Sequence, residues 1–184
     1  TTPITTPMTC PVCTTRLVYD KTDNIYPPKT LNCPNLECPS RDFFALKTAV
    51  SKNFLDIDGL SEVSLTWLNE TGRVNDISDL YTLTLTELAD SQLGLSKDGN
   101  PRRLGEKRAQ NILNHIEASK TLPLYRLLIS LNIAGLGPTT AKLLIKNFTT
   151  LENIQTLTVN DIEPIEGLST ITATKIVTGL AYRK

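Results

Sequence analysis

Four cysteines near the start of the sequence form the pattern best suited to metal chemistry. Their spacing is C-x2-C-x19-C-x4-C, and the candidate metal ligands are Cys10, Cys13, Cys33 and Cys38. A CxxC turn places two thiolates on one side of the chain, and a second pair can complete a tetrahedron around Zn²⁺. Because all four positions would be protein ligands, such a zinc would be structural rather than catalytic. Disulfides and a thioredoxin-like redox pair are the competing interpretations.

A glycine-containing unit that recurs along the chain is the second candidate site. Three copies start 32 residues apart: PRRLGEKRAQNIL at Pro101, IAGLGPTTAKLLI at Ile133 and IEGLSTITATKIV at Ile165. A looser copy, IDGLSEVSLTWLN, starts at Ile57. Each unit predicts a tight turn, where glycine permits a positive φ, followed by the start of a helix. An internal repeat is stronger evidence than any single motif.

The chemistry that suits this repeated turn is anion binding. A helix start carries free N–H groups and the positive end of the helix dipole. Turns at regular spacing could therefore contact successive phosphates of a nucleic acid, with nearby cations such as Lys146 adding charge. The residues assigned to this contact are Gly105, Lys107, Arg108, Gly135, Gly137, Thr139, Lys142, Gly167, Ser169 and Lys175. The alternative is that each glycine pair only caps one helix before the next begins.

The first copy differs from the others in its charge. Asp56, Asp58 and Glu62 lie near its turn, and no lysine accompanies them. Carboxylates disfavour a phosphate at the same place. We therefore expect the first copy to be architectural.

The elements that position these residues divide the chain into three parts. Residues 1–9 are Thr/Pro-rich and predict a linker. Residues 10–40 predict a small four-cysteine zinc finger with a short β-hairpin, formed by extended pieces around residues 17–20 and 30–32. Residues 41–184 predict a domain of short helices with four hairpins, near residues 57–68, 101–112, 133–144 and 165–176. The expected fold class is mainly α.

Composition limits the possible partners and location. The 184 residues are 40% apolar, and 19 basic residues balance 19 acidic ones. This net charge excludes a strongly cationic nucleic-acid binder but leaves room for a local basic face. No apolar run is long enough to span a bilayer, and we expect no membrane partner and a reducing, cytoplasmic location. Because the sequence starts at Thr1 rather than methionine, we expect a segment of a longer protein.

The segments CPVC…CPNLECPS, FLDIDGL, LYTLTLTEL, NILNHIEASK and GLGPTTAKLL together resemble the C-terminal half of bacterial NAD-dependent DNA ligases. The resemblance runs from Cys10 to about Ala181, and a four-cysteine finger followed by four helix-hairpin-helix motifs is characteristic of that family. It implies that the cysteines hold structural zinc. It also implies that the turns around Gly105, Gly135–Gly137 and Gly167 grip duplex DNA at a nick, through the minor groove and without reading sequence.

By this resemblance the parent protein would be an enzyme that seals nicks with NAD during DNA replication and repair. The family's adenylating lysine lies in a K-x-D-G motif; Lys97-Asp98-Gly99 is one residue too short and predicts a turn. This segment would therefore be inactive alone and would not bind NAD. It would rely on the adenylation and OB domains of the same polypeptide. The departures from the family pattern are Arg103 and Ser169 at glycine positions and the insertion-like stretch Gly94–Arg103.

Two other functions remain open at this stage. One is a helix-hairpin-helix module of another DNA-repair or junction-binding protein. The other is a zinc-organised protein-interaction scaffold, which the zero net charge favours. His115, the sole histidine, predicts a helical surface position without an acid–base partner. Trp67 predicts a packing role, and nothing distinguishes Tyr19 and Tyr26 from residues that fill a small core.

Overall fold

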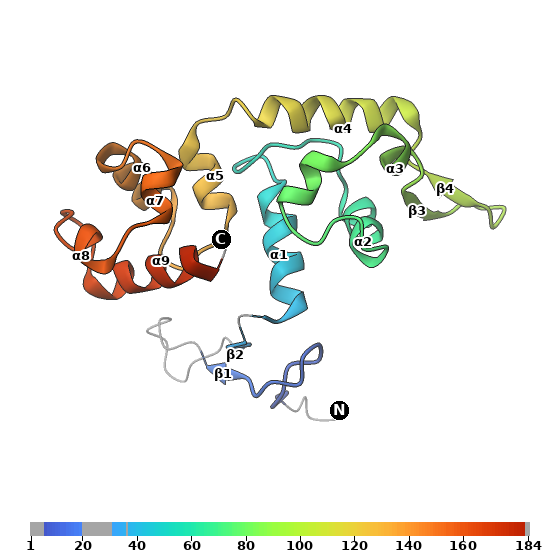
Figure 1. Cartoon of the computed structure of the whole chain (residues 1–184). Coiled ribbons are helices and arrows are strands. Elements are labelled where there is room, and N and C mark those ends of the chain that lie inside the picture. Colours follow the sequence, from blue (N-terminus) through green and yellow to red (C-terminus); the bar gives the residue numbers. More distant parts are fainter. Residues whose placement is uncertain (1–5, 20–30, 36, 183–184) are drawn as a thin grey trace. The chain divides into compact units, whose positions relative to one another are not determined.

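The computed structural model describes residues 6–19, 31–35 and 37–182 (Figure 1). The chain divides into two compact units, an N-terminal unit, Thr1–Phe44, and a helical unit, Ala45–Lys184. The division falls within helix α1 (Pro39–Ala49). Within the described ranges, no helix combines the length and apolar character that crossing a bilayer requires.

The N-terminal unit contains the short β-hairpin that the sequence predicts. Strands β1 (Val18–Tyr19) and β2 (Leu31–Asn32) are antiparallel, with Val18 opposite Asn32 and Tyr19 opposite Leu31. An isolated bridge joins Thr9 to Arg16 and closes the segment that carries the first two cysteines. Tyr26 and most of the predicted linker lie outside the described residues.

The helical unit is built from successive helix pairs, which confirms the mainly α prediction (Figure 1). α1 is followed by α2 (Glu62–Glu70). Packed pairs then follow along the chain: α3 (Leu85–Ala89) with α4 (Glu106–Ser119), α5 (Leu124–Ser130) with α6 (Pro138–Asn147), and α8 (Val159–Ile162) with α9 (Thr170–Tyr182). A 3-10 helix, η1 (Ser78–Thr82), and α7 (Leu151–Gln155) lie in the connections. The turns before α2, α4, α6 and α9 are called hairpins one to four.

Local capping explains where several of these helices begin. The Ser61 side chain accepts a hydrogen bond from the Ser64 amide and caps α2. Thr84 begins α3 through a capping box, in which its hydroxyl accepts the Glu87 amide while the Glu87 carboxylate accepts the Thr84 amide. Such caps satisfy amides that the helix itself leaves unbonded, and each stabilises a helix by about 1 kcal/mol.

The repeated apolar positions form the core of the helical unit. The alanines that match between repeats, Ala109, Ala141 and Ala173, are fully buried. Three residues further along, the apolar positions are fully buried as well: Leu68, Ile112, Leu144 and Ile176. The repeat is therefore a packing repeat, in which small and large buried residues alternate at helical spacing.

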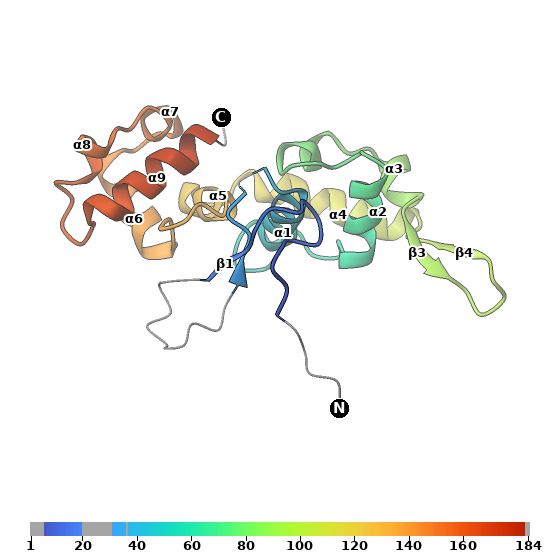
Figure 2. The ribbon, with the colours of Figure 1, turned by 90° about the horizontal axis from the view of Figure 1, so that it is seen from below.

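One part of the helical unit is not helical, contrary to the prediction for residues after Arg41. Strands β3 (Gln92–Leu95) and β4 (Pro101–Arg103) form an antiparallel ribbon between α3 and α4. Figure 2 shows this ribbon extending beyond the helices beside it. Its turn contains Lys97-Asp98-Gly99, so the turn predicted at this point is confirmed. The inserted residues pack on a helix, α2, only at the base of the ribbon, and backbone pairing between the two strands satisfies their polar groups.

Candidate metal centre and phosphate-binding turns

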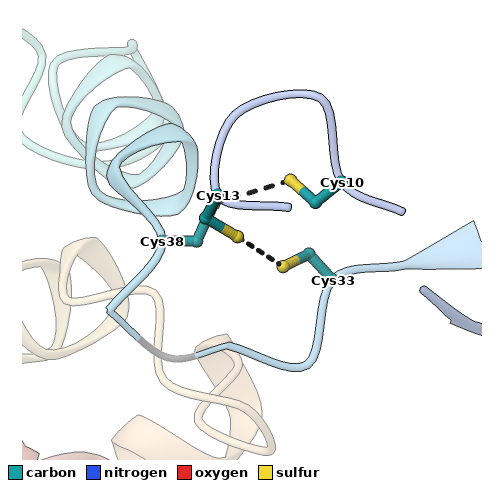
Figure 3. A group of neighbouring side chains, drawn as sticks. All are labelled: Cys10, Cys13, Cys33 and Cys38. Carbon is teal, nitrogen blue, oxygen red and sulfur yellow. Dashed lines mark hydrogen bonds between the residues drawn. The ribbon is translucent and has the colours of Figure 1, made fainter. Parts of the chain in front are cut away.

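The four cysteines converge on one point in the N-terminal unit, as their spacing predicts (Figure 3). Their sulfur atoms all lie within 4.8 Å of one another. Cys10 Sγ is 3.9 Å from Cys38 Sγ, and Cys13 Sγ is 3.5 Å from Cys33 Sγ. Four sulfurs at about 2.3 Å from a tetrahedral zinc would be about 3.8 Å apart, so the donor set fits a closed metal site. A disulfide needs about 2.05 Å, and these distances do not fit one.

The backbone around the CxxC turn holds the first two sulfurs in place. The Cys10 amide donates to the Thr15 carbonyl at 2.8 Å, and the Thr14 amide donates to the Cys10 carbonyl at 2.9 Å. Thr14 takes a positive φ of 58°, which closes the turn tightly. The second pair lies between β2 and the start of α1, where the Arg41 amide donates to the Cys38 carbonyl at 2.8 Å.

The thiols differ in acidity because their surroundings differ. Hydrogen bonds from the side chain and backbone of Thr15 lower the pKa of Cys13 to about 6. Burial raises the pKa of Cys33 to about 12 and raises the pKa of Cys38. A metal cation favours the thiolate form of every sulfur that it binds. The cluster can therefore act chemically as a four-thiolate metal ligand set.

Hairpin three carries two glycines, and their surroundings differ. Gly135 has a positive φ of 85°, and a Cβ there would lie 3.1 Å from Thr172 Cγ2, so both backbone and packing require glycine. Gly137 is different: its φ is −82°, and no atom lies within 4 Å of the place a Cβ would take. The fold therefore does not explain the second glycine, and the space before α6 is empty.

The amides at this helix start are also unoccupied. No side chain caps α6, and within the described residues the Gly137 amide has no hydrogen-bond partner. Pro138 at the first helical position has no N–H, and the next two amides, Thr139 and Thr140, precede the first intrahelical bond, from Ala141 to the Gly137 carbonyl. This arrangement can accept an anion.

Hairpins one and four carry acidic or hydroxyl groups of the protein beside their turns. In hairpin one the Asp58 carboxylate accepts the Gly59 amide at 2.9 Å. In hairpin four the Ser169 hydroxyl accepts the Thr172 amide at 3.2 Å, and the Thr170 hydroxyl donates to the Glu163 carboxylate at 2.6 Å. A carboxylate beside each of these two turns disfavours a phosphate there, although Lys47 pairs with Glu62 of hairpin one at 2.7 Å.

Hairpin two has a different backbone, as the departure at Arg103 suggested. Arg103 lies in β4 and pairs with Asp90 at 2.5 Å, so its guanidinium is engaged within the protein. The positive φ moves to Gly105, at 83°. The Gly105 amide donates to the Ala89 carbonyl at 3.0 Å and is not available to a phosphate. Lys107 and Arg108 are exposed on the first turn of α4.

The charge of the neutral chain is divided unevenly among the four turns. Residues 121–151, which contain hairpin three, include no Asp or Glu and carry three cations: Arg126, Lys142 and Lys146. Residues 152–174, which contain hairpin four, include four acidic residues and no basic one: Glu152, Asp161, Glu163 and Glu166. Lys142 is held by a cation–π contact, with its Nζ 5.0 Å from the centre of the Tyr125 ring. The exposed Lys175 of α9 is the basic residue nearest to hairpin four in the sequence.

The remaining predicted residues lie on other parts of the structure. His115 is exposed on α4, as predicted. Trp67 is half-buried on α2, with the Arg73 guanidinium 5.6 Å from its ring centre, and Tyr19 is 49% exposed. Sequence reasoning missed the bond between Asp58 and Gly59. The acidic residues around hairpin one were the signal that could have revealed it.

Comparison with known proteins agrees with these features. A family model described as a helix-hairpin-helix motif matches residues 126–182, which contain hairpins three and four. The chain is 35% identical over 182 residues to a DNA ligase 2 of Deinococcus deserti, covering 98% of this chain and 24% of that protein. It is 36% identical over 176 residues to a DNA ligase of Anoxybacillus flavithermus (96% and 24%) and 34% identical over 171 residues to one of Thermotoga neapolitana (93% and 23%).

The chain spans about a quarter of the length of the curated relatives that it matches. Almost every residue of the chain takes part in the match. The order of elements agrees with the resemblance found in the sequence, because the four-cysteine cluster precedes the helix-hairpin-helix motif. The chain is therefore similar, over almost its whole length, to one segment of proteins named DNA ligase.

Proposed function

We propose that this chain is a DNA-holding segment of a DNA ligase and that hairpin three provides its principal phosphate contact. The observation that carries the proposal is the start of α6, where Gly137 leaves empty space before unbonded amides. Amides at a helix start bind phosphate oxygens through hydrogen bonds and the helix dipole. Such contacts recognise the backbone rather than the bases, so binding would not depend on sequence.

The charges around hairpin three support the same role. The absence of carboxylates from residues 121–151 leaves Lys142 and Lys146 free to attract phosphates without local competition. Hairpin two contributes Lys107 and Arg108 as a second, weaker contact, because its Gly105 amide is already bonded. Hairpins one and four are architectural in this proposal. The proposed DNA-binding surface is thus a local basic region on a chain whose net charge is zero.

The metal centre has a structural role in the proposal. The four-thiolate set fits Zn²⁺ and leaves no open coordination position. The zinc would join the CxxC turn to the start of α1 and so fix the small N-terminal unit, whose short strands cannot provide a core of their own.

The sealing reaction itself would belong to the parent protein. Lys97, the nearest match to an adenylating lysine, lies in the turn of the β3–β4 ribbon rather than in a binding site. We therefore propose that nick sealing and NAD use reside in other domains of the polypeptide. This segment would hold nicked duplex DNA through the minor groove and would be inactive alone.

The test is fluorescence anisotropy of labelled nicked duplex, intact duplex and single strand, measured across a salt series. In Gly137→Thr, the new side chain fills the empty space and its hydroxyl caps the free amides. The φ and ψ of Gly137, −82° and 178°, suit a β-branched residue, so the fold should be kept. Loss of one charged hydrogen-bonded contact should weaken duplex binding roughly tenfold, alike for all sequences.

Ser61→Thr is the matched control, because it adds the same methyl group at the corresponding position of hairpin one and keeps the cap. This control should bind DNA as the original chain does. Unchanged affinity in a folded Gly137→Thr protein would refute the role of hairpin three. Absence of duplex binding by the original chain at low salt would refute DNA holding by this segment.

A further inference from the structure

The β3–β4 ribbon, here called the arm (Gln92–Arg103), is an ordered projection that contributes little to the core. Leu95 is 70% exposed, and of its two strands only Leu93 is half-buried. The base of the arm packs on α2, while its turn is closed by its own hydrogen bonds. The Ser96 amide donates to the Asn100 carbonyl at 2.7 Å, and the Gly99 amide donates to the Ser96 carbonyl at 3.0 Å. An ordered projection without a packing role points to an external partner.

The cations of the arm divide into one that anchors it and two that are free. Arg103 pairs with Asp90 and ties the base of the arm to the end of α3. Lys97 and Arg102 are exposed and form no ion pair with any residue that the structure describes. Neighbouring residues of a strand point to opposite faces, so Arg102 projects from the face opposite Arg103. Asp98 in the turn is the one carboxylate of the arm.

The free cations lie next to a basic stretch already assigned to DNA. Lys107 and Arg108 follow Glu106 in the first turn of α4, a short distance after the arm in the chain. The exposed apolar surface of the arm is limited to single side chains, whereas the buried core of a protein–protein interface is apolar and depleted of charged residues. Positive charge on a narrow two-stranded ribbon instead suits a nucleic acid, whose groove can admit such a ribbon.

We propose that the arm lies along the duplex beyond the hairpins and contacts its phosphates through Arg102 and Lys97. This inference rests on the proposed function, because it extends the same DNA path. From Gln92 to Lys97 the arm reaches about 17 Å at about 3.4 Å per residue. That length covers about five base pairs. The arm therefore lengthens the bound stretch of DNA without adding sequence recognition.

The test compares the original chain with Lys97→Ser/Arg102→Ser on duplexes shortened in steps of about 10 base pairs, one helical turn. Each phosphate neutralised contributes about 0.9 to the slope of log affinity against log salt, so the double variant should lose about 1.8 on long duplexes. On the shortest duplex that still binds, the two proteins should have equal affinity. Arg102→Lys keeps the charge, so in combination with the original Lys97 it should restore the full slope.

Lys52→Ser is the control for loss of a cation, because Lys52 is exposed, has no side-chain ion pair in the described chain and lies outside the arm. If the slope of log affinity against log salt were the same for the original chain and the double variant on every duplex, the inference would be overturned. An arm that binds a protein instead of DNA would give this result. If Gly137→Thr also bound normally, the proposed role of hairpin three would fail with it. If Gly137→Thr bound weakly, the failure would be confined to the arm.

Discussion

Replacing Gly179 by alanine should destabilise the helical unit, because α9 packs closely against the residue that begins hairpin three. A Cβ built on Gly179 would overlap the Ile133 side chain, with Ile133 Cγ1 3.1 Å and Ile133 Cβ 3.2 Å away. Ile133 is 8% exposed and β-branched, so its χ1 rotamer cannot change freely to make room. Either α9 or hairpin three must shift.

The expected magnitude is the difference between two effects. Overpacking of a buried contact costs about 1–3 kcal/mol, and alanine in place of a helical glycine recovers about 1 kcal/mol. The net loss should be about 1 kcal/mol. In an Ile133→Ala background the obstacle is absent, so Gly179→Ala should instead stabilise by about 1 kcal/mol. The coupling between the two positions should therefore be about 2 kcal/mol.

The assay is urea unfolding of the metal-loaded chain, followed by circular dichroism at the helix band, for the four members of this cycle. Thr178→Ala is the matched control, because Thr178 is exposed on the same helix and the change improves helix propensity without a clash. If Gly179→Ala were as stabilising as Thr178→Ala in the original background, the close packing of α9 on Ile133 would be refuted.

Two further predictions concern the metal and the caps. Chelation of the metal, or Cys38→Ser, should unfold the N-terminal unit. Trp67 fluorescence, which reports on the helical unit, should keep its folded value. A single joint unfolding transition of both units would contradict this prediction. Glu87→Gln should lower stability at neutral pH, because hydrogen bonds from Thr84, followed by the charge of Arg73, lower the pKa of Glu87. The stabilisation from the ionised Glu87 carboxylate is complete above the ordinary carboxyl pKa of 4.5, and it is lost as the pH falls through the lowered pKa of the folded state. The difference in free energy of unfolding between the original chain and Glu87→Gln, measured over a pH series, should therefore shrink in acid. A difference independent of pH would refute the capping role.

The features that the sequence predicted correctly are those set by local spacing. The CxxC pair brings two sulfurs together within one turn, and the second pair follows the short strand β2, so the cluster depends on little long-range geometry. The repeat predicted the helix starts because its apolar positions share one packing role. Ala141 and Leu144, for example, are fully buried at the positions where the other copies are also buried.

The features that the sequence did not predict depend on contacts between segments. The bond between Thr170 and Glu163 crosses a turn of seven residues, and no periodic pattern indicates it. The arm was missed because its strands are four and three residues long, too short for a period-two pattern to stand out. The Gly105 amide is not available to a phosphate because it donates to the Ala89 carbonyl at the end of α3, a contact that the sequence does not indicate.

The Asp58 carboxylate of hairpin one places an anion of the protein itself at its own turn. It is tethered beside the Gly59 amide, so an external anion must compete with a partner at high effective concentration. Meanwhile Leu65 and Leu68 keep the buried pattern of the other copies. Occupancy of a turn and packing of its helix are thus controlled by different residues. Under the proposed function, a change of one surface side chain would therefore open or close a turn to a phosphate, while the architecture that spaces the turns remains the same.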